Sequence, residues 1–255
     1  MTPSNLVYGA VAFGLSMSLA TPLIYPMAAG IRGTPLLLVI VAAVLLGVAS
    51  FSGYDSNHPR RNTLMYILDH DAKEAVWAST DTKVDSWTSL FLGDDPTREP
   101  LHALYPFFPR EGFVAEAPVA DLRPPSITVL TDARGPEGGV LSLLIRSERG
   151  APTLDVYLDQ GTELIASSVN GQRVTGQWDS QWYFGIRYYG VGSDGIILDL
   201  TLTSDRKIGV SVVDQSYQLV PESLEGFPDR PRHMMPEPVP DYHTDSTFVR
   251  ASFRI

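Results

Sequence analysis

The first 54 residues contain one ionisable side chain of the Lys, Arg, Asp and Glu classes, Arg32. The whole chain of 255 residues has 19 Lys+Arg and 29 Asp+Glu, so residues 55–255 hold 18 and 29, a balance of −11. The mean hydropathy of +0.01 is therefore an average over two unlike parts. Because charge is so unevenly distributed, we expect an uncharged part and an acidic part that fold separately.

Two uncharged stretches dominate the first part, residues 6–29 and 35–51. A helix needs about 17–25 apolar residues to cross a bilayer, and neither stretch shows the polar face expected of a soluble hairpin. A cleaved signal peptide is disfavoured because no Lys or Arg precedes the first stretch. The pattern predicts a two-helix transmembrane hairpin, and with it an integral membrane protein in contact with membrane lipid.

Small residues recur at a spacing of four within both predicted helices. This spacing lets helix backbones approach closely in lipid. The predicted helix-packing residues are Ala10, Gly14 and Ser18 in the first helix and Ala43 and Gly47 in the second.

From residue 55 onward, short apolar runs alternate with turn residues, a pattern typical of antiparallel strands. We expect a β-hairpin of residues 63–68 and 75–79, a third strand at 87–92, and a proline-rich connection at 93–125. Residues 126–255 then read as a β-sandwich with an extended tail. The predicted fold is mainly β, an antiparallel β-sandwich preceded by the transmembrane hairpin. The predicted regions are 1–54, 55–125 and 126–255.

Several classes of chemistry are disfavoured by the sequence. An acidic surface repels phosphate, so nucleic acid is not an expected partner. The chain has no cysteine, no paired-histidine zinc motif and no Gly-x-Ser-x-Gly nucleophile motif. Asp69, His70 and Asp71 have metal-ligand chemistry, but their place in a hairpin turn favours a capping role. We therefore predict no catalytic residue and no metal ligand in this chain.

One aromatic stretch leaves two interpretations open. Trp178, Trp182 and Tyr188 lie in the densest aromatic segment of the chain. Such side chains can stack on a glycan or peptide ligand, or they can fill the core of the sandwich as large aromatic side chains usually do. The alternative function is therefore a glycan- or peptide-binding β-sandwich module.

A longer series of motifs resembles a known family. Asn62-Thr63-Leu64 opens the series, Phe107-Phe108-Pro109 lies between its early and late motifs, and Asp214-Gln215-Ser216-Tyr217 opens the late ones. Their order over residues 36–255 resembles the C-terminal region of multi-pass zinc metallopeptidases of the vacuolar membrane protease and endoplasmic reticulum metallopeptidase type. One departure is residues 218–221, where the family pattern has glycine after the tyrosine and a shorter path to proline. The residues taken as family-signature or interaction residues are Asn62, Tyr66, Asp69, Trp77, Asp85, Trp87, Asp214, Ser216, Arg230, Pro231, Met234, Pro236, Asp245 and Ser246.

The resemblance also implies what this chain lacks. Family members carry a two-zinc peptidase domain with a catalytic Glu, and this chain has no Glu-Glu pair and no matching ligand motif. Any zinc cofactor would belong to that missing domain. The resemblance implies an extracytoplasmic, non-catalytic accessory domain that packs on or positions a peptidase domain, or joins further membrane helices, supplied by another chain or by a longer protein.

Overall fold

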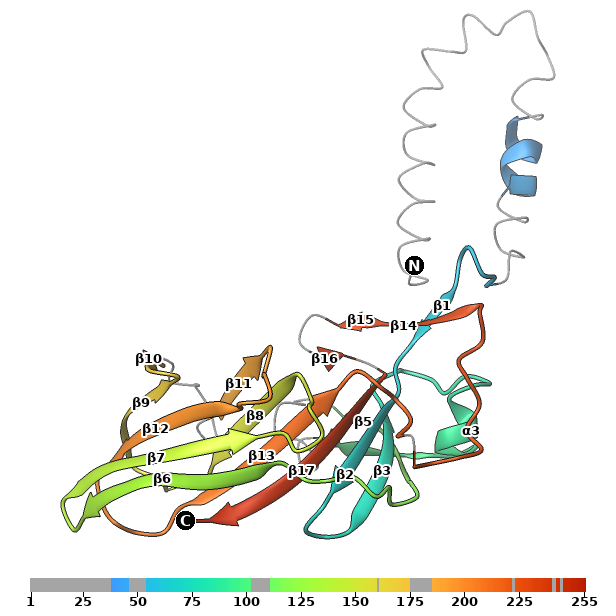
Figure 1. Cartoon of the computed structure of the whole chain (residues 1–255). Coiled ribbons are helices and arrows are strands. Elements are labelled where there is room, and N and C mark those ends of the chain that lie inside the picture. Colours follow the sequence, from blue (N-terminus) through green and yellow to red (C-terminus); the bar gives the residue numbers. More distant parts are fainter. Residues whose placement is uncertain are drawn as a thin grey trace, which may run out of the picture. The chain divides into compact units, whose positions relative to one another are not determined.

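The computed structural model describes residues 38–45, 54–101, 111–159, 161–174, 185–221, 223–239, 242–243 and 245–255. The chain divides into two compact units, Met1–Tyr54 and Asp55–Ile255. In the first unit, residues 38–45 form a helix whose apolar side chains are largely exposed. The second unit is mainly β, as the sequence predicts (Figure 1).

The prediction of a two-helix transmembrane hairpin is wrong for the described part of the chain. The helix at 38–45 has eight residues and is about 12 Å long, against a bilayer core of about 30 Å. None of the described helices is long and apolar enough to cross a membrane. Apolar composition had suggested the span, but spanning requires a long continuous helix. The integral-membrane localisation is corrected with it.

Of the predicted helix-packing residues, the structure describes one. The first predicted span, 6–29, lies outside the described residues, together with Ala10, Gly14 and Ser18. Gly47 also lies outside them. Ala43 lies in the described helix at an exposed position.

Two sheets make up most of the second unit. The larger has eight strands in the order β11 (Gly185–Tyr189), β8 (Thr153–Leu158), β13 (Gly209–Ser216), β17 (Ser246–Arg254), β2 (Met65–Asp69), β3 (Glu74–Ser79), β5 (Glu111–Glu116), β4 (Thr97–Pro100). The smaller has five in the order β10 (Gln172–Arg173), β9 (Leu164–Val169), β12 (Ile196–Leu202), β7 (Gly138–Arg146), β6 (Ser126–Gly135).

Two further strand pairs form small two-stranded sheets of their own. β1 (Arg60–Asn62) pairs in parallel with β14 (Met234–Pro236), and β15 (Pro238–Val239) pairs with β16 (Tyr242–His243). The last strand, β17, inserts between β13 and β2 and runs parallel to β2. The sandwich is predicted to be antiparallel, and the structure adds two parallel pairs, each of which joins a strand before residue 70 to a strand after residue 233.

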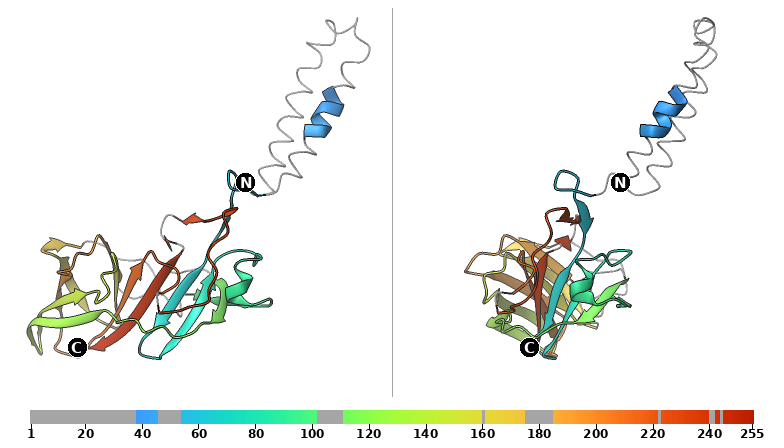
Figure 2. Two further views of the ribbon diagram at one scale, coloured as in Figure 1. Left: turned by 45° about the vertical axis from the view of Figure 1, so that its right-hand side comes forward. Right: turned by 90° about the vertical axis from the view of Figure 1, so that its right-hand side faces the viewer.

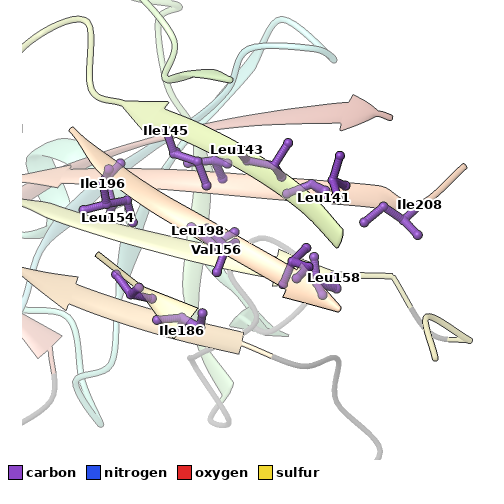
Figure 3. Packing of buried hydrophobic residues seen from close by; sticks show 14 of the residues in the cluster. Leu141, Leu143, Ile145, Leu154, Val156, Leu158, Ile186, Ile196, Leu198 and Ile208 are labelled. Atoms are coloured by element: carbon purple, nitrogen blue, oxygen red, sulfur yellow. The ribbon is translucent and has the colours of Figure 1, made fainter. Parts of the chain in front are cut away.

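The first apolar core lies between the smaller sheet and the β8–β13 end of the larger one. Alternate residues of β12, Ile196, Leu198, Leu200 and Leu202, are buried there against β7 and β8 (Figure 3). This alternation is the two-residue period expected when one face of a strand meets the core. The two sheets thus pack face to face as a sandwich at this end.

A second apolar core covers the β2–β3 end of the larger sheet. Its residues include Trp77 on β3, Phe91 on the short helix α3 (Ser89–Leu92) and Val249 on β17. Val249 lies opposite Asp214 of β13 in the sheet. Asp214 is two residues along β13 from Val212, which belongs to the first apolar core. Because residues two apart in a strand share a face, both cores lie on the same face of the larger sheet.

Local predictions in residues 55–125 are confirmed in part. The β2–β3 hairpin forms, with Asp69 Oδ1 accepting hydrogen bonds from the amides of Asp71 and Ala72, 3.0 Å each. The third strand predicted at 87–92 is instead a helical turn, because Asp85 Oδ1 accepts hydrogen bonds from the amides of Trp87 and Thr88. The predicted irregular connection at 93–125 contains β4 and β5.

Candidate functional site

Residues of the resemblance that lie far apart in sequence meet beside β1 and β14. Asn62 Nδ2 donates hydrogen bonds to Asp85 Oδ2, 2.8 Å, and to Met234 Sδ, 3.5 Å. Pro236 pairs with Asn62 across the parallel strands, which lie side by side in Figures 1 and 2. Pro231 accepts a hydrogen bond from the Met234 amide, 2.8 Å. Two segments about 170 residues apart are thus held together by side-chain and backbone bonds.

Asp85 is the centre of this contact. Burial alone would raise the pKa of Asp85, but hydrogen bonds from Thr88, Asn62 and Trp87 hold the pKa below its usual value. The carboxylate is therefore stabilised in its charged form inside the protein. Asn62 Oδ1 is buried with no hydrogen-bond partner among the described residues.

Arg230 extends the cluster on the other side of Trp87. Its guanidinium lies 4.2 Å from the Trp87 ring centroid and forms two bonds with Asp245, from Nε at 3.1 Å and from Nη2. Burial raises the pKa of Asp245 despite the bonds from Arg230. The Trp87 indole N–H donates to the Pro228 carbonyl, 3.2 Å. Arg230 is thus fixed by both an ion pair and a cation–π contact.

Tyr66 and Trp77 form the apolar base of the same cluster. Their rings meet edge to face with centroids 5.0 Å apart. The Tyr66 hydroxyl donates to the Pro118 carbonyl, 2.8 Å, and accepts from the Ala120 amide, 2.9 Å. We call Asn62, Tyr66, Trp77, Asp85, Trp87, Arg230, Met234 and Asp245 the signature cluster.

Pro231 and Pro236 adjoin this cluster, and the other four signature residues lie outside it. Asp69 caps the β2–β3 turn and pairs with Arg250, 3.7 Å. Ser246 Oγ accepts a hydrogen bond from Gln215 Nε2, 3.0 Å. Asp214 and Ser216 belong to a separate polar junction, which lies between the two apolar cores.

Arg149 organises that junction, and sequence reasoning missed it. Its Nε donates to Asp214 Oδ1, 2.8 Å, its Nη1 to Ser216 Oγ, 2.6 Å, and its Nη2 to the carbonyl oxygens of Asp214 and Thr247. Ser147 Oγ donates to Asp214 Oδ2, 2.5 Å. Burial raises the pKa of Asp214, and Arg149 and Ser147 oppose that rise. Arg149 lies in a short turn after β7, where no local pattern distinguishes it from a solvated arginine.

An open polar pocket of about 520 Å³ lies beside Arg149. Its hydroxyl and charged lining offers hydrogen bonds to a polar group of a ligand. The lining residues are Asp121, Leu122, Arg149, Ser216, Gln218, Pro221, Ser223 and Thr247. Its positive and negative side chains balance, so the pocket has no strong preference for an anion or a cation.

Metal and aromatic ligand sites gain no support from the geometry. Among the residues that the structure describes, no group of three His, Asp or Glu side chains is placed to hold a metal ion. Trp178 and Trp182 lie outside the described residues. Tyr188 is half-buried on β11, packs against the sandwich core, and its hydroxyl accepts a bond from Asn170 Nδ2, 3.3 Å. Tyr188 is thus the one described residue of the three, and its half-buried ring gives the stacking alternative no support.

Comparison with known proteins does not assign the chain to a family. No protein-family model, no curated protein and no solved structure matches it.

Proposed function

We propose that residues 55–255 form a non-catalytic accessory domain that packs on and positions a zinc exopeptidase-type peptidase domain, supplied by another chain or by a longer protein. The proposal starts from the resemblance carried by the signature residues. It does not require a metal or a reactive side chain in this unit.

The observation that carries this proposal is the bonding of the signature cluster. Asp85 is bonded to Asn62, and Arg230 to Asp245 and the Trp87 ring. Polar groups bound to one another in this way hold a fold in one geometry, whereas a general acid, base or nucleophile must be able to reach a substrate. A domain that positions a partner needs such a fixed geometry.

The test is to mix the full chain with the purified peptidase domain of a member of the family that it resembles. We expect co-elution in size-exclusion chromatography and a higher melting temperature of the peptidase domain in the complex. Absence of a complex at micromolar concentrations of both folded proteins would contradict the proposal.

A second measurement addresses catalysis. The full chain with added zinc is incubated with aminoacyl and dipeptidyl chromogenic substrates, and the peptidase domain alone serves as the positive control. We expect no turnover by the chain. Turnover that a chelator abolishes would show that the chain is itself a peptidase.

A further inference from the structure

The free edges of the two sheets differ sharply in length. The larger sheet ends at β11 and β4, with five and four residues, and the smaller sheet ends at β10, with two, and at β6, with ten. β4 also contains Arg98, Glu99 and Pro100, which are residues that discourage pairing with another strand. β6 is therefore the one long edge among the described strands, and it runs along the outside of the smaller sheet in Figures 1 and 2.

β6 leaves both backbone and apolar side chains accessible. Within the described residues it pairs with β7 alone, so its other edge presents peptide groups that no strand satisfies. Residues 128–133 are exposed, and Val129 and Leu130 retain 45% and 47% of their accessible surface. The pairing with β7 shifts register between Val129 and Thr131, which turns the strand locally but leaves both flanks paired.

Within β6 the more exposed charge is negative. Asp132 and Arg134 form an ion pair of 2.7 Å, in which the Asp132 side chain is 42% exposed and the Arg134 side chain 5%. Near the ends of the strand the exposed charges are mixed, since Glu137, Glu148 and Arg146 are all exposed. The Arg146 guanidinium donates to the Asp194 carbonyl, 3.3 Å. In the second half of β6 an approaching chain thus meets the Asp132 carboxylate more readily than the Arg134 guanidinium.

We propose that the free edge of β6 binds an extended segment of a partner protein, which adds a strand to the five-stranded sheet. Main-chain hydrogen bonds provide the contact, as in other cases of strand addition. Apolar side chains of the segment cover Leu130, and the Lys or Arg side chains that alternate with them lie beside Asp132. This inference rests on the proposed role of residues 55–255 as an interaction domain, and it specifies which surface of the domain contacts the partner.

A second copy of this chain fits the edge less well. Pairing β6 with its own copy would bring together two molecules that each carry a net charge of −10. Molecules of like net charge repel one another. A basic and apolar partner segment avoids this repulsion.

The test uses the full chain and a synthetic peptide of about eight residues in which Lys and Val alternate, with both ends blocked. Binding is measured by fluorescence anisotropy, and amide hydrogen exchange locates the site. We expect saturable binding that weakens with added salt, because exposed charges are screened. We also expect new protection in residues 126–135. Protection confined to other segments would overturn the proposal.

Three matched comparisons sharpen the result. Leu130→Lys is expected to weaken binding about tenfold, because a charge replaces an apolar contact, whereas Ile165→Lys, at an exposed apolar position on β9, leaves it unchanged. A peptide methylated on alternate amide nitrogens is expected not to bind. Equal binding of that peptide, or equal effects of the two substitutions, would overturn strand addition at β6. Concentration-dependent dimerisation of the chain that Leu130→Lys abolishes would assign the edge to a second copy instead.

The same variants separate this proposal from the accessory role. If the peptidase domain binds wild type and Leu130→Lys equally, the β6 surface is wrong and the accessory role stands. If the peptide protects β6 and the peptidase domain does not bind, the accessory role is wrong and the β6 surface stands.

Discussion

Arg149 Nε lies 2.8 Å from Asp214 Oδ1, and this pair joins the turn after β7 to the end of β13. Asp214 is buried and the Arg149 side chain is 14% exposed. Because the guanidinium also bonds the carbonyl oxygen of Thr247 on β17, it holds the smaller sheet to two strands of the larger one. The junction lies between the first and second apolar cores described above.

Arg149→Met is expected to lower the free energy of unfolding by about 3–5 kcal/mol, because the substitution leaves the Asp214 carboxylate buried without its counter-charge. Urea denaturation followed by circular dichroism measures the change. The double variant Arg149→Met/Asp214→Asn is the control. It removes the unpaired charge and should recover part of the lost free energy of unfolding. A double variant less stable than expected from adding the two single effects would contradict this account.

Asp155 supplies a prediction about pH. It accepts two bonds from Arg187, 2.8 and 3.0 Å, yet burial raises its pKa from 3.8 to about 6. The folded protein then binds the Asp155 proton more tightly than the unfolded chain does. The contribution of Asp155 to the free energy of unfolding therefore falls as pH rises from about 4 to about 6, by up to roughly 3 kcal/mol.

Asp155→Asn tests this directly, because asparagine does not titrate in that range. Chemical denaturation of wild type and variant at pH values between 4 and 7 gives the comparison. The fall in stability of wild type between about pH 4 and 6 should be smaller in the variant. Parallel curves would show that Asp155 does not contribute to the pH dependence.

Arg230→Lys is expected to cost about 1–3 kcal/mol of folding stability, because lysine cannot form the forked pair with Asp245 or lie flat on the Trp87 ring. The melting temperature measures the change. Arg232→Lys is the matched control, since Arg232 is exposed on the same segment, and should change stability by less than about 0.5 kcal/mol. Equal effects of the two substitutions would contradict the cluster geometry.

Two neighbours on β12 test the sandwich. Leu198 is fully buried between the sheets, and Ile197 faces outward at 39% exposure. Leu198→Ala should cost about 2–5 kcal/mol through a cavity, and Ile197→Ala less than about 1 kcal/mol. Denaturation midpoints of the two purified variants measure this difference. A larger effect at Ile197 would place the opposite face of β12 in the core.

The sequence predicted local elements better than their connections. Alternation predicted strands within residues 126–255, where β7, β8 and β12 form, and the turn residues between 68 and 75 predicted the β2–β3 hairpin. It failed at residues 87–92, where the Asp85 cap starts a helical turn that an apolar run does not reveal. It also failed at residues 35–51, where apolar composition predicted a span and the described helix has eight residues.

The candidate site shows the same limit. The motifs include Asn62, Asp85, Arg230 and Met234 among fourteen signature residues and do not predict which of them meet. The structure brings these four together. The motifs did not reveal Arg149, because a lone arginine in a turn has the same local sequence whether it is solvated or paired with a buried carboxylate.

By itself, the sequence determined the mainly β character and the acidic surface of residues 55–255, because side-chain alternation and charge are properties of short stretches and of composition. The tertiary structure alone decided that β17 runs parallel to β2, that Arg149 meets Asp214 and that β6 is left as the long free edge. The first two of these features depend on contacts between segments about 65–180 residues apart. The packing of both sheets selects those contacts, and no local pattern encodes them.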